Sequence, residues 1–178
     1  IVTLPRLRRA VRSVRRELED LGFWDEAVAE IDVHLVTAGY AYGWCWHGSG
    51  DGDIEIPKYS VSKLIDRLGL GNGYLPLAMV IRHEYGHAVA DTHRRLVETK
   101  RFEKAFWAEY SDDTVAEFDP EIYVSPYAAW NCQEDFAEVF SFYLKHQGKI
   151  PARLDTATIR AKWEFVKWMG EKISAKRR

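Results

Sequence analysis

The sequence is short of cysteine, of long apolar runs and of net charge, and each shortage excludes a class of protein. Its 178 residues include two cysteines, Cys45 and Cys132, which form neither a disulfide framework nor a C-x-x-C motif. No apolar run reaches the roughly 18 residues of a membrane span. Because 25 basic residues nearly balance 27 acidic ones, the net charge gives no reason to expect a nucleic-acid or membrane partner.

We expect a single domain over residues 1–178, because this length and a hydrophobic content of 47% suffice to bury one core. Few cysteines and the lack of a signal or membrane segment favour a cytoplasmic location for the chain as given. Its first residue is Ile1 rather than Met, which leaves a removed leader or a neighbouring domain open. The oligomeric state is not predictable from these features.

Hydrophobic periodicity predicts an α+β fold that is mostly helical, with a small mixed sheet beside the helix that carries the site. Apolar residues at helical spacing predict helices over residues 5–21, 77–96, 102–110, 132–146 and 156–173. Signals at the helix ends predict a short helix from Ser60 or Ser62 to Leu68, a glycine-rich connection over 69–73, and Pro76 in the first turn of the next helix.

Strand signals lie between the first two long helices. β-Branched and aromatic residues predict one or two strands within 32–46 and another over 54–59, joined by a turn at 47–53. Pro57 is tolerated best at a sheet edge. We therefore expect strand 54–59 to be an edge strand that could pair with an extended peptide substrate. An acidic loop over 111–126 is expected over or beside the cleft.

The helix over 77–96 contains an H-E-x-x-H segment, His83-Glu84-Tyr85-Gly86-His87. Helical residues four apart lie one turn above each other, so both imidazoles can hold one metal ion. Glu84 is rotated by about 100° from His83, so its carboxylate can hold a water without binding the metal. The segment therefore predicts a zinc hydrolase, with His83 and His87 as ligands and Glu84 as general base.

A catalytic zinc usually has three protein ligands, and the sequence offers Glu134 or His93 as the third. Glu134 has Glu138 one helical turn away, so one carboxylate could bind the metal while the other supports a ligating imidazole. His93 follows His83 by ten positions, as in the long metzincin motif. That motif needs a glycine where this chain has Ala90, and on an unbroken helix His93 would lie out of range.

Glu134 is the favoured third ligand, although a purely structural interpretation also exists. Asn131-Cys132-Gln133-Glu134 fits the capping-box pattern, in which the carboxylate only reaches back to the backbone. The H-E-x-x-H segment, and Glu138 on the same helical face, make metal binding the preferred interpretation.

Three segments of the chain follow one another in a fixed order: His83-Glu84-Tyr85-Gly86-His87-Ala88-Val89, then Ser125-Pro126-Tyr127, then Asn131-Cys132-Gln133-Glu134-Asp135-Phe136-Ala137-Glu138-Val139-Phe140. Together they resemble the catalytic domain of anthrax lethal factor and its relatives, a gluzincin family of zinc endopeptidases. The resemblance implies a zincin-like fold in which Zn²⁺ is bound by His83, His87 and Glu134. It further implies that Glu84 is the base, that Tyr127 is a catalytic donor to the transition state, and that Glu138 supports the site from behind the ligands. It covers roughly residues 82–144, so it implies no particular substrate sequence or partner.

We therefore expect a zinc metallopeptidase that hydrolyses the bonds of a peptide or protein substrate through a metal-bound water and a glutamate base, with no nucleic-acid or membrane partner. The alternative is a non-catalytic, zinc-stabilised interaction module. Glu84 argues against that alternative, because a structural site closes with four protein ligands and needs no base. A third hypothesis, nucleic-acid binding by the arginine-rich helix over 5–21, is weakened by the acidic residues that end this helix.

Overall fold

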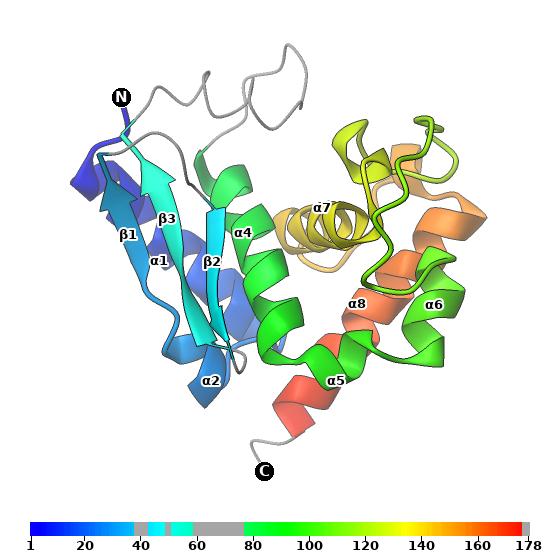
Figure 1. Ribbon diagram of the computed structural model, residues 1–178, viewed down its shortest axis with the longest axis horizontal. Helices are drawn as coiled ribbons and strands as arrows, with labels where there is room; N and C mark the ends of the chain where they lie inside the picture. Colours follow the sequence, from blue (N-terminus) through cyan, green and yellow to red (C-terminus); the bar gives the residue numbers. More distant parts are fainter. Residues whose placement is uncertain (38–42, 49–50, 59–76, 176–178) are drawn as a thin grey trace.

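The computed structural model describes residues 1–37, 43–48, 51–58 and 77–175 (Figure 1). Its elements in chain order are α1 (Leu4–Asp20), α2 (Glu26–Ala29), β1 (Val33–Val36), β2 (Gly43–Gly48), β3 (Asp51–Pro57), α4 (Leu77–Thr92), α5 (Arg94–Val97), α6 (Lys100–Phe106), η1 (Tyr127–Ala129), α7 (Cys132–Lys145), η2 (Ala152–Leu154) and α8 (Ala157–Ala175). The α+β class, mostly helical with a small sheet, is confirmed. The short helix ending at Leu68, the connection over 69–73 and Pro76 lie outside the described residues.

The three strands form one mixed sheet in the order β1-β3-β2 (Figure 1). β1 runs parallel to β3, whereas β2 and β3 form an antiparallel hairpin whose last pair is Gly48 with Asp51. The predicted turn over 47–53 is therefore narrower than expected, because both strands extend into it.

The prediction that strand 54–59 is an edge strand is wrong, because β3 lies between β1 and β2. Pro57 is compatible with this central strand because it occupies the last strand position. The backbone N–H of Lys58, one residue later, donates to the carbonyl of Val36 at 3.0 Å. The parallel ladder thus continues past the missing N–H of the proline. Among the described residues, Ile54 and Glu55 are paired on both sides, with β1 and with β2, so they leave no open edge for a peptide.

Helix α4 lies at the centre of the fold, between the sheet and α1 on one side and α7 on the other, with α8 and α6 beyond α7 (Figure 1). Its side that carries Leu77, Ile81, Tyr85 and Ala88 is buried. The helix with the H-E-x-x-H segment is therefore a core helix held by neighbours on both sides.

None of the helices among the described residues has the length and apolar character that a membrane crossing requires.

An ion pair joins α1 to α4 immediately beside the candidate site. Arg82 donates from Nε and Nη2 to the two carboxylate oxygens of Glu17, both at 2.7 Å, and both side chains are 11% exposed. Such a two-point, largely buried contact fixes orientation as well as distance. It holds α4 against α1 one residue before His83.

Candidate metal centre

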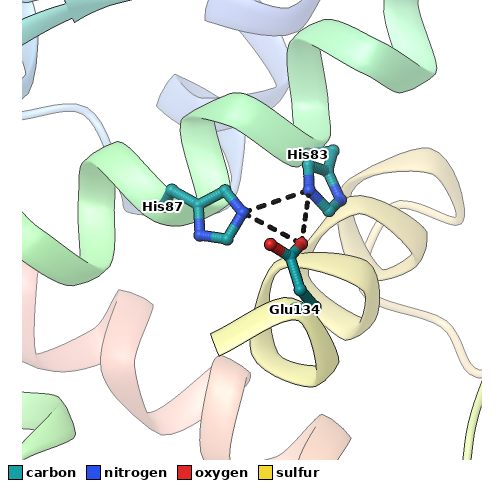
Figure 2. Close-up of side chains that lie close together, drawn as sticks. All are labelled: His83, His87 and Glu134. Carbon is teal, nitrogen blue, oxygen red and sulfur yellow. Dashed lines mark hydrogen bonds and ion pairs between the residues drawn. The ribbon is translucent and has the colours of Figure 1, made fainter. Parts of the chain in front are cut away.

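Three side chains converge between α4 and α7 (Figure 2). His83 and His87 project from adjacent turns of α4, and Glu134 projects from the first turn of α7. The Nε2 atoms of the two histidines lie 3.1 Å apart, and Glu134 Oε2 lies 3.0 Å from His83 Nε2 and 3.2 Å from His87 Nε2. The three ligand atoms therefore form a nearly equilateral triangle.

The size of this triangle fits a tetrahedral zinc ion. Ligand atoms about 2.0–2.1 Å from zinc at tetrahedral angles stand about 3.3 Å from one another, close to the 3.0–3.2 Å separations found here. Two imidazole nitrogens and a carboxylate oxygen at such distances also need a cation, either a proton or a metal ion, between them. Donor type, donor number and spacing thus agree with a zinc site.

Local helix chemistry places Glu134 at this point. Asn131 caps α7, and its side-chain oxygen accepts a hydrogen bond from the backbone N–H of Glu134 at 2.9 Å. The Glu134 carboxylate reaches the two histidines. The side chain of Glu134 therefore has the geometry predicted for a metal ligand. Only its backbone N–H takes part in capping the helix.

Gly86, within the H-E-x-x-H segment, allows the two ligand-bearing helices to approach closely. A Cβ at this position would lie 2.9 Å from the Cα of Ala137, on the turn of α7 next to Glu138. Real Cβ atoms essentially never come so close to another carbon atom. The missing side chain thus permits the backbone contact that brings Glu134 within reach of His83 and His87.

A second layer of hydrogen bonds supports the ligands. His83 Nδ1–H donates to Glu138 Oε1 at 2.7 Å, which directs its Nε2 atom toward the ligand triangle. The other oxygen of Glu138 accepts from Ser125 Oγ–H at 2.6 Å. His83 and Glu138 are 2% and 3% exposed, so this layer is shielded from water.

The carboxylates around His83 change its protonation. Burial lowers the pKa of His83, but its hydrogen bonds to the carboxylates of Glu134 and Glu138, and the nearby negative charges, outweigh burial, so the net pKa lies well above 6.5. Burial raises the pKa of Glu134, and the bonds from His83 and His87 reverse this effect, so its net pKa lies well below the ordinary value. The metal-free centre therefore holds a positive charge where a metal ion would sit.

Of the remaining predicted residues, Glu84 and Tyr127 lie close to His83, whereas His93 does not join the triangle. Glu84 is on α4 and 4% exposed, and its charge contributes to the raised pKa of His83. Tyr127, on η1, is half-buried, and the centre of its ring lies 5.6 Å from that of His83. His93, the rival ligand, is separate from the triangle, because it pairs with Asp25 across 3.2 Å.

Ser125 is the contributor that residue patterns alone did not single out. It lies two positions before Tyr127 and is 8% exposed, and its hydroxyl joins Glu138 to the turn that carries Tyr127. Its place in the Ser125-Pro126-Tyr127 segment was the available signal, but a serine before a proline more often marks an ordinary turn.

Comparisons with protein-family models, with curated proteins and with solved structures found no match. The geometry of the centre is therefore the basis for a functional proposal, and the resemblance to the lethal factor family stays a prediction.

Proposed function

We propose that the chain is a zinc-dependent metallopeptidase of the gluzincin type, with a zincin-like arrangement of α4 and α7. The observation that carries this proposal is the triangle of His83 Nε2, His87 Nε2 and Glu134 Oε2, with edges of 3.0–3.2 Å. A purely structural cluster needs neither this donor set nor a buried glutamate beside it. Two histidines, one carboxylate and Glu84 are the groups that a hydrolytic zinc site requires.

When bound, a zinc ion would supply Lewis acidity, which polarises a peptide carbonyl and lowers the pKa of water toward 7. The protein groups then divide the proton and charge transfers. Glu84 accepts the proton from the attacking water and delivers it to the amine nitrogen as the C–N bond breaks. Tyr127 donates a hydrogen bond to the carbonyl oxygen as it becomes an oxyanion, an interaction that strengthens in the transition state.

The exposure of the ligands favours an enzyme over a structural zinc module. His83 is buried, whereas the side chains of His87 and Glu134 keep 16% and 19% of their surface exposed, so one side of the triangle is accessible. Among the described residues, the group that includes these ligands holds three donors rather than four. A structural site closes with a fourth protein ligand, whereas a catalytic site leaves that position to water or substrate.

Metal analysis coupled to a peptide-library digest tests the proposal. The wild-type protein should bind one zinc ion and cleave peptides, and a chelator should abolish cleavage. Glu84→Gln should keep the zinc and lose cleavage by at least about 100-fold, the lower end of general-base contributions. His87→Ala should lose both.

Each contrary result has a distinct meaning. Cleavage retained by Glu84→Gln would refute the base assignment. One zinc ion bound by a wild-type protein that cleaves nothing in the library, and that unfolds when zinc is removed, would favour the structural module instead.

A further inference from the structure

Ser125 occupies a junction between two parts of the candidate site. Its hydroxyl donates to Glu138 Oε2 at 2.6 Å, and its oxygen accepts a hydrogen bond from the backbone N–H of Ala128 at 3.2 Å. Glu138 holds His83 through its other oxygen, and Ala128 follows Tyr127 in η1. One hydroxyl therefore contacts both the carboxylate that orients a metal ligand and the turn that carries the proposed oxyanion donor.

Both contacts of Ser125 are shielded from solvent. Ser125 and Ala128 are 8% and 1% exposed, and Glu138 is 3% exposed, so water cannot readily replace the hydroxyl. The 2.6 Å separation is typical of a hydrogen bond from a hydroxyl to an ionised carboxylate, which is about twice as strong as a neutral one. Without this donor, Glu138 could rotate about its terminal torsion and release the imidazole of His83.

We infer that Ser125 is a positioning residue of the metal centre, which fixes Glu138 and the Tyr127 turn together and so sets the orientation of His83. This inference depends on the proposed function in one respect, the assumption that the bound metal is zinc. It extends the supporting layer beyond Glu138, and it makes the positions of Tyr127 and His83 depend on the same hydroxyl, through two different hydrogen bonds.

The test compares Ser125→Ala with a matched control, Ser141→Ala. Ser141 is fully buried on α7 and also contacts α4, where its hydroxyl donates to the carbonyl of Met79 at 3.3 Å. Both variants thus remove a buried hydroxyl that joins α7 to a neighbouring segment, α4 for Ser141 and the turn before η1 for Ser125, but only the Ser125 hydroxyl contacts Glu138. Ser125→Thr, which keeps a hydroxyl, is the rescue variant.

Zinc affinity is the first readout, measured by competition with a chromophoric chelator. Ser125→Ala should bind zinc about 10- to 100-fold more weakly, the usual effect of losing support behind a ligand, while Ser141→Ala and Ser125→Thr stay within about threefold of wild type. Equal affinities of the two alanine variants, with both folded by circular dichroism, would overturn the inference.

The second readout needs neither zinc nor activity. In the metal-free protein, the His83 Nδ1–H proton should give a downfield NMR resonance, assigned by its loss in His83→Asn. This resonance should shift or broaden in Ser125→Ala and persist in Ser141→Ala and Ser125→Thr. If wild-type protein binds no zinc, the proposed function fails, and the NMR comparison alone then decides the role of Ser125: an unchanged resonance in Ser125→Ala refutes it.

Discussion

The substitution Gly86→Ala tests directly whether the close approach of α4 and α7 builds the centre. The new Cβ would lie 2.9 Å from the Ala137 Cα, whereas ordinary contacts begin at 3.4 Å, so the helices must separate by at least 0.5 Å. Such overpacking costs about 1–3 kcal/mol, and about 1 kcal/mol returns through the higher helix propensity of alanine. The expected net destabilisation is therefore about 0–2 kcal/mol.

The effect of Gly86→Ala on metal binding should exceed its effect on stability. Zinc–ligand distances tolerate about 0.2 Å, so a 0.5 Å shift of the helix that carries Glu134 removes this ligand from its productive position. We expect a zinc affinity lowered about 10- to 100-fold, or about 1.4–2.8 kcal/mol. Titration of the metal-free protein against a competing chelator measures the affinity, and urea unfolding of the same sample measures the stability.

Gly170→Ala is the matched control for this experiment. A Cβ on Gly170, in α8, would lie 2.6 Å from the carbonyl oxygen of Leu21 and 3.0 Å from the Phe23 ring, away from the three ligands. This variant should lose stability but keep its zinc affinity. The reasoning is refuted if both glycine variants bind zinc equally well, or if Gly86→Ala binds like wild type while remaining fully folded.

Four further predictions follow from contacts in and near the centre. Tyr127→Phe should lower kcat without changing zinc affinity; an unchanged rate would move the donor role to Tyr123 or another group. The raised pKa of His83 keeps a proton in the metal-free centre, so zinc affinity should increase with pH until that pKa is passed. Calorimetry in buffers of different ionisation enthalpy should detect the proton that zinc displaces. Zinc binding without proton release would contradict the assignment of His83 as a protonated ligand. In the metal-free protein the charged His83 adds stability that is fully present below about pH 6.5 and is lost as pH rises through the raised pKa, as urea titrations at several pH values would show. Lys162→Met should lower the free energy of unfolding by about 3–5 kcal/mol, because the Asp135 carboxylate, 3% exposed and 2.5 Å from the Lys162 ammonium, loses its partner. Lys162→Met combined with Asp135→Leu should recover most of this stability. No recovery would mean that packing rather than charge explains the cost.

Local signals were sufficient for the elements that carry the centre. The helix predicted over 132–146 is observed at Cys132–Lys145, because a capping asparagine begins it and Gly148, with a φ of +74°, follows its end. The pairs His83/His87 and Glu134/Glu138 depend only on helical spacing, so their faces could be predicted once both helices were recognised.

Features that depend on tertiary contacts could not be predicted from local patterns. The helix predicted over 77–96 ends at Thr92, and His93 turns toward Asp25, a residue distant in sequence. The order of the strands was missed because Pro57 marks a strand end as readily as a sheet edge. The role of Ser125 required knowing that its turn packs against the second turn of α7.

The hydrogen bonds around the centre converge on one carboxylate. The backbone N–H of Ala128 donates to Ser125 Oγ, and the Ser125 hydroxyl and His83 Nδ1–H each donate to a different oxygen of Glu138. Each buried polar atom along this path from Ala128 to His83 has a partner. The path ends at His83 Nε2, which faces His87 and Glu134. Burial of polar groups is costly unless they are satisfied, so this path stabilises the inner side of His83 while its Nε2 atom still requires a cation. A metal ion bound at the triangle would therefore complete a network that the fold has already satisfied on its other side.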